Sequence, residues 1–259
     1  MTARPMIAVL EREALKLLRQ RGRLLSAMVR PLLWLLVIGA GFKAQSFLVP
    51  GVLGMSLLFG AMLAALSTVY DKESGVMRML VIAPLAHYWI ALAKTLGATL
   101  AALVQALMLL VLLALLGYVS SQVSLWLLAV GLLGTAFACA SLGMLVAAWS
   151  RTLENYATMM NLVIFPVFFL SGSLYPVQQL PAVLRLIATL NPYTYGVDLL
   201  KHAGLAGPAV AAVPDFEVGL DLVVLIGFSA AALTVAGVRF SRDAATEPLV
   251  HRLARKQSD

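Results

Sequence analysis

Long apolar runs constrain this chain more than any other feature of its sequence. The clearest two, residues 52–70 and 124–149, contain no ionised side chain. A helix needs about 20 apolar residues to cross the hydrocarbon core of a bilayer, and six segments approach that length: 31–49, 52–70, 92–118, 124–149, 156–173 and 218–238. Because 61% of the residues are hydrophobic and only 12% are charged, polar side chains cannot cover a water-exposed surface. The sequence predicts an all-α integral membrane protein with six transmembrane helices.

Residues 1–30 differ from these runs, because basic side chains lie between apolar ones at helical spacing. The apolar positions are Ile7, Leu10, Ala14, Leu17, Leu18, Leu25 and Met28, and the basic ones between them include Arg12, Lys16, Arg19, Arg21 and Arg23. This pattern predicts an N-terminal amphipathic helix that lies in the membrane interface, followed by a six-span domain over residues 31–259. A cleaved signal peptide is the alternative, but too many residues precede the first apolar run for a short basic leader.

The distribution of basic residues predicts the orientation in the membrane. If both termini are cytoplasmic, 16 of the 19 Lys and Arg residues face the cytoplasm, and those outside are Lys43, Arg185 and Lys201. Cytoplasmic loops carry the excess of Lys and Arg. We therefore expect a bacterial-type inner (cell) membrane protein, with the loop 71–87 and the tail 239–259 in the cytoplasm. The net charge of +7 gathers near the chain ends, which favours membrane lipid over nucleic acid as a partner.

Motifs for catalysis and energy conversion are missing from the sequence. The only Lys-Thr pair, Lys94-Thr95, has no Gly at position 89 and so does not end a P-loop that could cradle phosphates. The three histidines are too far apart in sequence to suggest a metal site. We expect no enzyme, no metal and no cofactor in this chain. An ion-coupled carrier is disfavoured, because the apolar runs offer no convincing intramembrane charge.

Prolines divide the segment 172–204, which follows the fifth apolar run. Because Pro fixes φ and lacks an N–H, it begins or ends a helix. The spacing predicts two short helices, Pro181–Leu190 and Pro192–His202, with Asn191 capping the second. Neither can span a bilayer, so we expect a re-entrant segment that covers the outer mouth of a pathway. Its candidate site residues are Gly172, Pro176, Pro181, Asn191 and Pro192.

Two stretches carry a family resemblance. YDKESGVMRMLVIAPLAHYWIALAKTL resembles the first cytoplasmic loop of the type-2 ABC (ABC-2 type) transporter permeases, in which an acidic residue, a Gly, a Leu and a Pro precede the Lys that opens the third span. FLSGSLYPVQQLPAVLRLIATLNPYTYGVDLLK is similar to the family's succession of Ser-Gly, Pro, Leu-Pro and Asn-Pro between spans five and six. The resemblance extends over essentially the whole chain.

This resemblance implies a division of work between subunits. In the family, a short coupling helix in that loop docks into a separate ATPase subunit, which binds ATP and Mg²⁺, and two permease subunits work with two ATPases. The matching positions here are Glu73, Gly75, Arg78, Leu80 and Pro84. Charge at the rim of such an interface sets register and partner choice. Without the resemblance, the charges of the loop would be explained by solvation alone.

Two further patterns leave alternatives open. Small residues recur every fourth position and permit close approach of another helix, either within the bundle or in a dimer: Gly131, Thr135, Cys139 and Gly143. Residues that share one helical face in the second and fifth runs are candidates for lining a pathway, although core packing is the commoner role of such residues: Phe59, Met62, Leu66, Asn161, Phe165 and Phe169.

These features together predict the permease subunit of an ATP-driven ABC exporter. Because the spans are mainly apolar, an amphipathic or lipid-linked cargo, such as a drug, a lipid or a glycan, is favoured over a small ion. The alternative from another class is a non-transporting membrane anchor subunit of a redox or assembly complex, which would have no stable ATPase partner. Homodimers and heterodimers, and envelopes with one membrane or two, fit the sequence equally.

Overall fold

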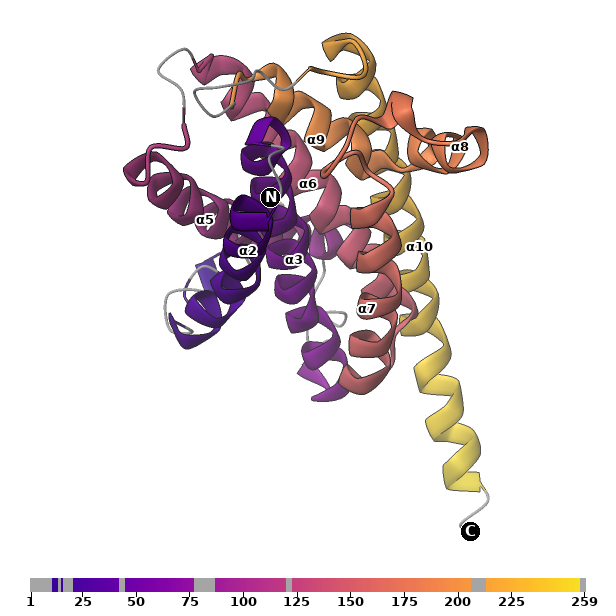
Figure 1. Ribbon diagram of the computed structural model, residues 1–259. Helices are drawn as coiled ribbons and strands as arrows, with labels where there is room; N and C mark the ends of the chain where they lie inside the picture. The colour runs from indigo at the N-terminus through magenta and orange to yellow at the C-terminus, as the bar shows by residue number, and fades with distance from the viewer. Residues whose placement is uncertain are drawn as a thin grey trace.

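The computed structural model is an assembly of packed helices (Figure 1). It describes residues 11–13, 15, 21–41, 45–76, 87–119, 123–205 and 213–256. The helices in those ranges are α2 (Arg21–Gly41), α3 (Gln45–Glu73), α5 (His87–Leu115), α6 (Leu125–Trp149), α7 (Leu153–Phe169), the 3-10 turn η1 (Val177–Gln179), α8 (Ala182–Leu190), α9 (Pro192–His202) and α10 (Val218–Lys256). Much of the amphipathic helix predicted for residues 1–30 lies outside the described residues.

Four of the described helical segments are long and apolar enough to cross a membrane: Val49–Glu73, Tyr88–Leu115, Leu125–Trp149 and Val218–Phe240. Two shorter apolar segments, Met28–Val37 and Leu153–Phe169, accompany them. The predicted apolar runs therefore fall on helices, and the helix composition is that of a multi-pass membrane protein.

The predicted limits of the first span, 31–49, are wrong. α2 runs without interruption through Pro31, so the expected boundary at residue 30 lies inside a helix. That helix ends at Gly41, and α3 begins at Gln45 and contains Pro50 in its interior. Proline is tolerated inside membrane helices, because neighbouring groups satisfy the backbone carbonyl that loses its N–H partner. Here proline marks no helix end.

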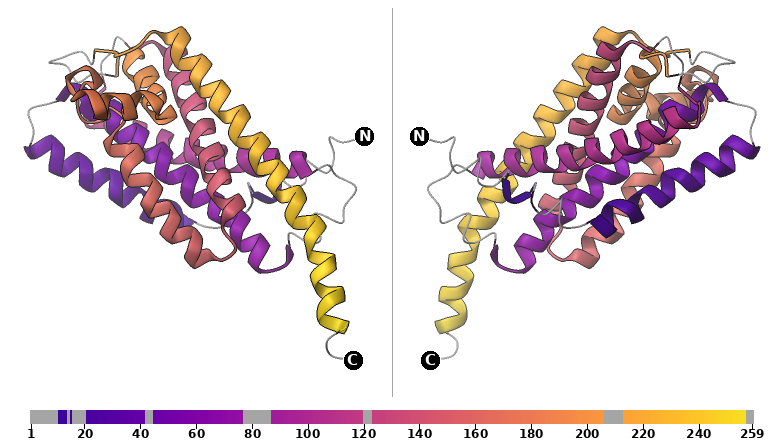
Figure 2. Two further views of the ribbon diagram at one scale, coloured as in Figure 1. Left: turned by 90° about the vertical axis from the view of Figure 1, so that its right-hand side faces the viewer. Right: turned by 90° about the vertical axis from the view of Figure 1, so that its left-hand side faces the viewer.

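α3 forms the centre of the bundle. It packs against α2, α5, α6, α7 and α9, and most of its apolar stretch is buried, whereas α5, α6 and α10 bury half or less of theirs. Exposed apolar surface on this scale suits contact with lipid. The two side views show that α10 is the longest helix and that its C-terminal part extends beyond the other helices (Figure 2).

The small-residue stripe of α6 packs inside the bundle, which decides between the two alternatives for it. A Cβ added to Gly143 would lie 2.9 Å from the Cβ of Ala65 on α3. Thr135 faces Gly196 of α9, where an added Cβ would lie 2.7 Å from the Thr135 side chain, and Gly131 also packs against α9. The stripe therefore brings α3 and α9 close to α6.

Asn191 joins α8 to α9 in the predicted way. It ends α8 and caps α9, because its side-chain oxygen accepts a 3.1 Å hydrogen bond from the backbone N–H of Tyr193. Its side-chain amide donates to the carbonyl of Val167 on α7 at 2.7 Å. Pro192 occupies the first turn of α9, where a missing N–H costs nothing.

The other candidate residues of the segment 172–204 shape the chain between α7 and α8. Gly172 has a φ of 73°, a conformation that favours glycine. Pro176 and Pro181 immediately precede η1 and α8. The helix α8 exposes several apolar side chains, whereas α9 is almost entirely buried. The two short helices lie at the end of the bundle opposite the C-terminus (Figure 1).

Gly51 on α3 provides a test of this packing. A Cβ there would lie far inside van der Waals contact with the backbone carbonyl of Ser173, which cannot move aside alone. Gly51→Ala should lower the free energy of unfolding by about 1–3 kcal/mol, the usual cost of overpacking, as measured by thermal unfolding in detergent. Gly227→Ala on α10 is the matched control, because nothing lies within 4 Å of the added carbon. It should leave stability unchanged or raise it by roughly 0.5–1 kcal/mol. Equal melting temperatures for the two variants would contradict the packing.

Candidate functional site: the charged end of α3

Three consecutive charged residues end α3: Asp71, Lys72 and Glu73. Successive residues of an α-helix point about 100° apart, so the three side chains reach different neighbours. They stand at the start of the predicted coupling loop, 71–87. Sequence analysis selected only Glu73 of the three as a site residue, because that position matched the family pattern; the contacts of all three are with residues distant in the sequence.

Asp71 lies at the centre of a buried ion network. Its carboxylate is 2.5 Å from the Nζ of Lys94 on α5 and 2.7 Å from the guanidinium of Arg12. Lys94 also pairs with Glu13 at 3.2 Å, and Ser67 donates to the Glu13 carboxylate at 3.1 Å. The side chains of Asp71 and Lys94 are 0% and 1% exposed. Because buried charges require partners, this network ties the described N-terminal residues to α3 and α5.

Lys72 holds the end of α6. Its ammonium donates to the backbone carbonyls of Ala147 and Ala148 at 3.0 and 3.1 Å. The last carbonyls of a helix have no intrahelical partner, and a cation interacts favourably with the negative end of the helix dipole. The same ammonium lies 4.6 Å from the ring centroid of Phe240 on α10, within the range of a cation–π interaction. Lys72 therefore joins α3 to both α6 and α10.

Glu73 holds the start of α7. Its carboxylate accepts a 3.0 Å hydrogen bond from the backbone N–H of Leu153, the first residue of that helix. Thr152 caps the same helix by accepting a 3.2 Å hydrogen bond from the backbone N–H of Asn155. The first N–H groups of a helix lack intrahelical partners, and a carboxylate there is favoured by the helix dipole. The predicted docking residue Glu73 is thus also a bridge between α3 and α7.

Gly75 follows α3 by two residues, where the loop begins. Its φ of 75° is a conformation that side chains with a Cβ rarely adopt, and its N–H donates to the carbonyl of Lys72 at 3.2 Å. The other predicted docking positions lie outside the described residues: Arg78, Leu80 and Pro84.

The candidate pathway residues of α3 lie in the core. Phe59 and Met62 are buried, and Leu66 is half-buried. The Met62 carbonyl accepts a 2.7 Å hydrogen bond from the hydroxyl of Tyr156 on α7, and the guanidinium of Arg30 lies 5.0 Å from the centroid of the Phe59 ring. These positions are those expected of core packing.

The candidate pathway residues of α7 lie on the surface of the chain. Asn161, Phe165 and Phe169 are all exposed. The rings of Phe165 and Phe169 stack with centroids 6.3 Å apart, and Trp34 of α2 meets Phe169 edge-on at 5.9 Å. The described helices therefore present an aromatic face on α2 and α7.

A second polar cluster, which the sequence analysis missed, joins α9 to the start of α10. The carboxylate of Asp198 accepts hydrogen bonds from the backbone N–H groups of Asp215 and Phe216 at 2.8 and 2.9 Å. Lys201 pairs with Asp215 at 2.6 Å and lies 3.4 Å from Asp198. These contacts fix the described chain before α10 against the buried face of α9.

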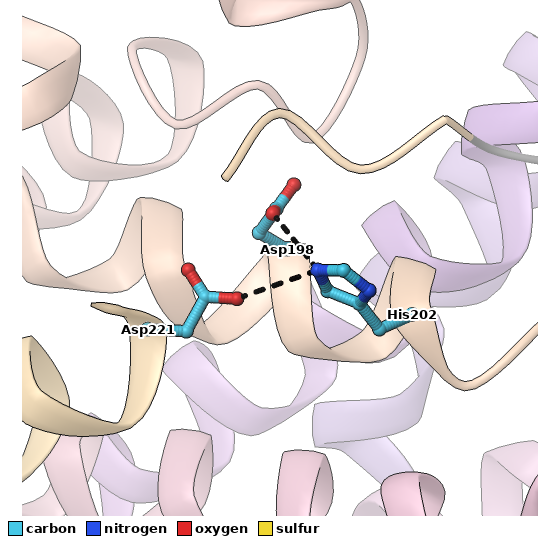
Figure 3. Close-up of side chains that lie close together, drawn as sticks. All are labelled: Asp198, His202 and Asp221. Atoms are coloured by element: carbon cyan, nitrogen blue, oxygen red, sulfur yellow. Dashed lines mark ion pairs between the residues drawn. The ribbon is translucent and has the colours of Figure 1, made fainter. Parts of the chain in front are cut away.

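His202 and Asp221 complete this α9–α10 cluster (Figure 3). The Nε2 of His202 is 3.7 Å from an Asp198 oxygen and 3.9 Å from an Asp221 oxygen. Asp198 and His202 are four residues apart on one helical face, which was the only local signal available. Asp221 comes from α10, so sequence spacing between histidines could not reveal the group.

The fold and these contacts define a multi-pass helical membrane protein. Its central helix, α3, ends in three charged residues that contact the neighbouring helices. The family model for the ABC-2 type transporter matches residues 5–203, and the chain belongs to that family. "Putative transport permease ycf38" of Porphyra purpurea is 27% identical over 213 residues, which cover 75% of this chain and 72% of the relative. The protein of the same name in Cyanophora paradoxa is 24% identical over 248 residues, with coverages of 86% and 84%.

A shorter and closer similarity joins the chain to a bacterial relative. Nodulation protein J of Rhizobium leguminosarum bv. trifolii is 40% identical over 76 residues, which are 29% of this chain and 29% of that protein. The match thus spans less than a third of the relative's length.

Removing the charge of Asp71 tests the ion network. Asp71→Asn leaves Arg12 and Lys94 without their shared partner and should lower the free energy of unfolding by about 3 kcal/mol, as expected for a broken buried pair. Arg12→Gln should cost less than about 1 kcal/mol, because the Arg12 side chain is 35% exposed. Unfolding in mixed detergent micelles measures both. Adding Lys94→Met to Asp71→Asn should recover part of the loss. Equal losses for Asp71→Asn and Arg12→Gln would show that burial does not set the strength of these pairs.

Proposed function

We propose that this chain is the permease subunit of an ATP-driven exporter, and that the loop after α3 receives the movement of a separate ABC ATPase. The strongest support is the root of that loop, where Asp71, Lys72 and Glu73 hold α5, α6, α7, α10 and the N-terminal segment. A force on the loop therefore acts on α3, in the centre of the bundle, and on every element held by these charges. Two ATPase copies supply ATP and Mg²⁺ chemistry to a pair of permeases, identical or different.

We assign six spans to the chain, with α2 and α7 as the first and fifth. The 17 residues of α7 extend about 25 Å, close to the hydrocarbon thickness of about 30 Å. The excess of basic residues supports cytoplasmic termini in a bacterial-type inner membrane. The charged end of α3 then faces the cytoplasm, and α8 and α9 form the outer re-entrant segment.

The exposed aromatic face of α2 and α7 supports a pathway shared with the second permease. Phe165 and Phe169 lie on the surface of the single chain, where a second permease or membrane lipid can contact them. A pathway lined by aromatic and apolar side chains suits an amphipathic or lipid-linked cargo, such as a drug, a lipid or a glycan, better than a small hydrophilic ion. We propose cargo of that class.

Co-purification from native membranes tests the exporter assignment. An ABC ATPase should be recovered with the wild-type chain and lost with Arg78→Glu, because the reversed charge opposes docking at the loop. Glu73 is a poorer choice for reversal, since its carboxylate also holds the start of α7. The matched control is Arg185→Glu on α8, at the opposite end of the bundle, which should retain the ATPase.

Each other outcome has a defined meaning. If the ATPase is recovered with Arg78→Glu as well, the exporter assignment is kept, but Arg78 is not part of the docking surface. If no ATPase accompanies the wild type under conditions that keep other membrane complexes intact, the exporter assignment fails and the membrane anchor alternative replaces it.

A further inference from the structure

We propose that Asp198, His202 and Asp221 bind a divalent transition-metal cation, for which Zn²⁺ is the best match, and that the ion fastens α9 to the start of α10. One ligand atom from each residue lies within 4.8 Å of the other two. Figure 3 shows one imidazole nitrogen of His202 directed at both carboxylates. The site stands whether or not the chain couples to an ATPase, since all three residues belong to this chain alone.

Asp221 is the residue that most requires a partner. Its side chain is 0% exposed, and neither carboxylate oxygen has a hydrogen-bond partner among the described residues. The Nε2 of His202 lies 3.9 Å away, which is beyond hydrogen-bond distance. An ionised carboxylate without a partner is among the costliest groups to bury. A cation between Asp221 and His202 supplies the missing interaction.

The net charge of the α9–α10 cluster also favours binding of a divalent cation. Its described residues comprise three carboxylates, those of Asp198, Asp215 and Asp221, and one ammonium, that of Lys201. With all three carboxylates ionised and His202 neutral, the cluster carries a net charge of −2 in a largely buried environment. A divalent cation neutralises this charge, and it leaves the 2.6 Å pair between Lys201 and Asp215 in place.

The donor set matches zinc. Zinc accepts imidazole nitrogen and carboxylate oxygen at about 2.0–2.2 Å, usually with four ligands in a tetrahedron. The carbonyl of Phe216 accepts a hydrogen bond from the Nε2 of His202 at 2.9 Å; in the zinc-bound form the ion replaces the proton on Nε2, and this carbonyl is close enough to serve as the fourth ligand. Packing of the Phe216 ring against Tyr195, with centroids 4.9 Å apart, helps to hold that carbonyl in place. The His202 side chain is 20% exposed, which leaves a route of entry for the ion.

Zinc uptake by the purified full-length chain tests the site. After treatment with a chelator, the protein in detergent micelles is equilibrated with Zn²⁺, and bound zinc is measured by mass spectrometry of the element. We expect one zinc ion per wild-type chain and a rise in melting temperature of roughly 5 °C at saturation. Asp221→Asn and His202→Gln should each weaken binding by about tenfold or more. His87→Gln, at the start of α5, should bind zinc as the wild type does.

Asp221→Asn also separates loss of the metal from loss of the fold. Because the carboxylate has no described hydrogen-bond partner, its uncharged isostere should keep or raise the melting temperature of the zinc-free protein. The rise caused by zinc should disappear in this variant. A wild type that takes up no zinc, or binding unchanged in both Asp221→Asn and His202→Gln, would overturn the proposal.

Discussion

The buried pair between Asp71 and Lys94 is the interaction on which this end of the bundle depends. Apolar burial alone does not fix how membrane helices sit against one another, because lipid solvates their side chains as well as protein does. Charged groups are different, since each buried ion costs several kcal/mol unless it meets its partner. With Arg12 and Glu13 completing the network, the observed position of α3 against α5 gives each of these charges a partner.

In the middle of the bundle, close packing of small residues fixes the positions of α3 and α9 against α6. The stripe of α6 lets α3 and α9 approach it on two sides, through Gly143 and through the contact of Thr135 with Gly196. These contacts have no charge to be satisfied, and their strength lies in van der Waals contact over a short distance. The charged residues at the end of α3 and the small-residue stripe of α6 together define the arrangement of helices whose other side chains are mostly apolar.

Local signals in the sequence predicted what is local in the structure. The limits of α6, α8 and α9 follow within a residue or two from apolar runs, prolines and the cap at Asn191. The limits of α2 and α3 were not predicted correctly. Pro31 and Pro50 lie inside these helices, which membrane helices tolerate and which the rule that proline begins or ends a helix did not anticipate. Contacts between distant residues, such as Glu73 with Leu153 or His202 with Asp221, have no signature in a single sequence.

The length of α10 links features that lie at opposite ends of the molecule. Asp221, in the α9–α10 cluster, and Phe240, beneath the ammonium of Lys72, belong to the same unbroken helix. The 19 residues from one to the other correspond to about 28 Å of helix. A helix of this length behaves as a rod, so a tilt or slide imposed at the Asp221 end displaces the Phe240 end as well. A movement at the α9–α10 cluster is therefore transmitted through α10 to Lys72 at the end of α3.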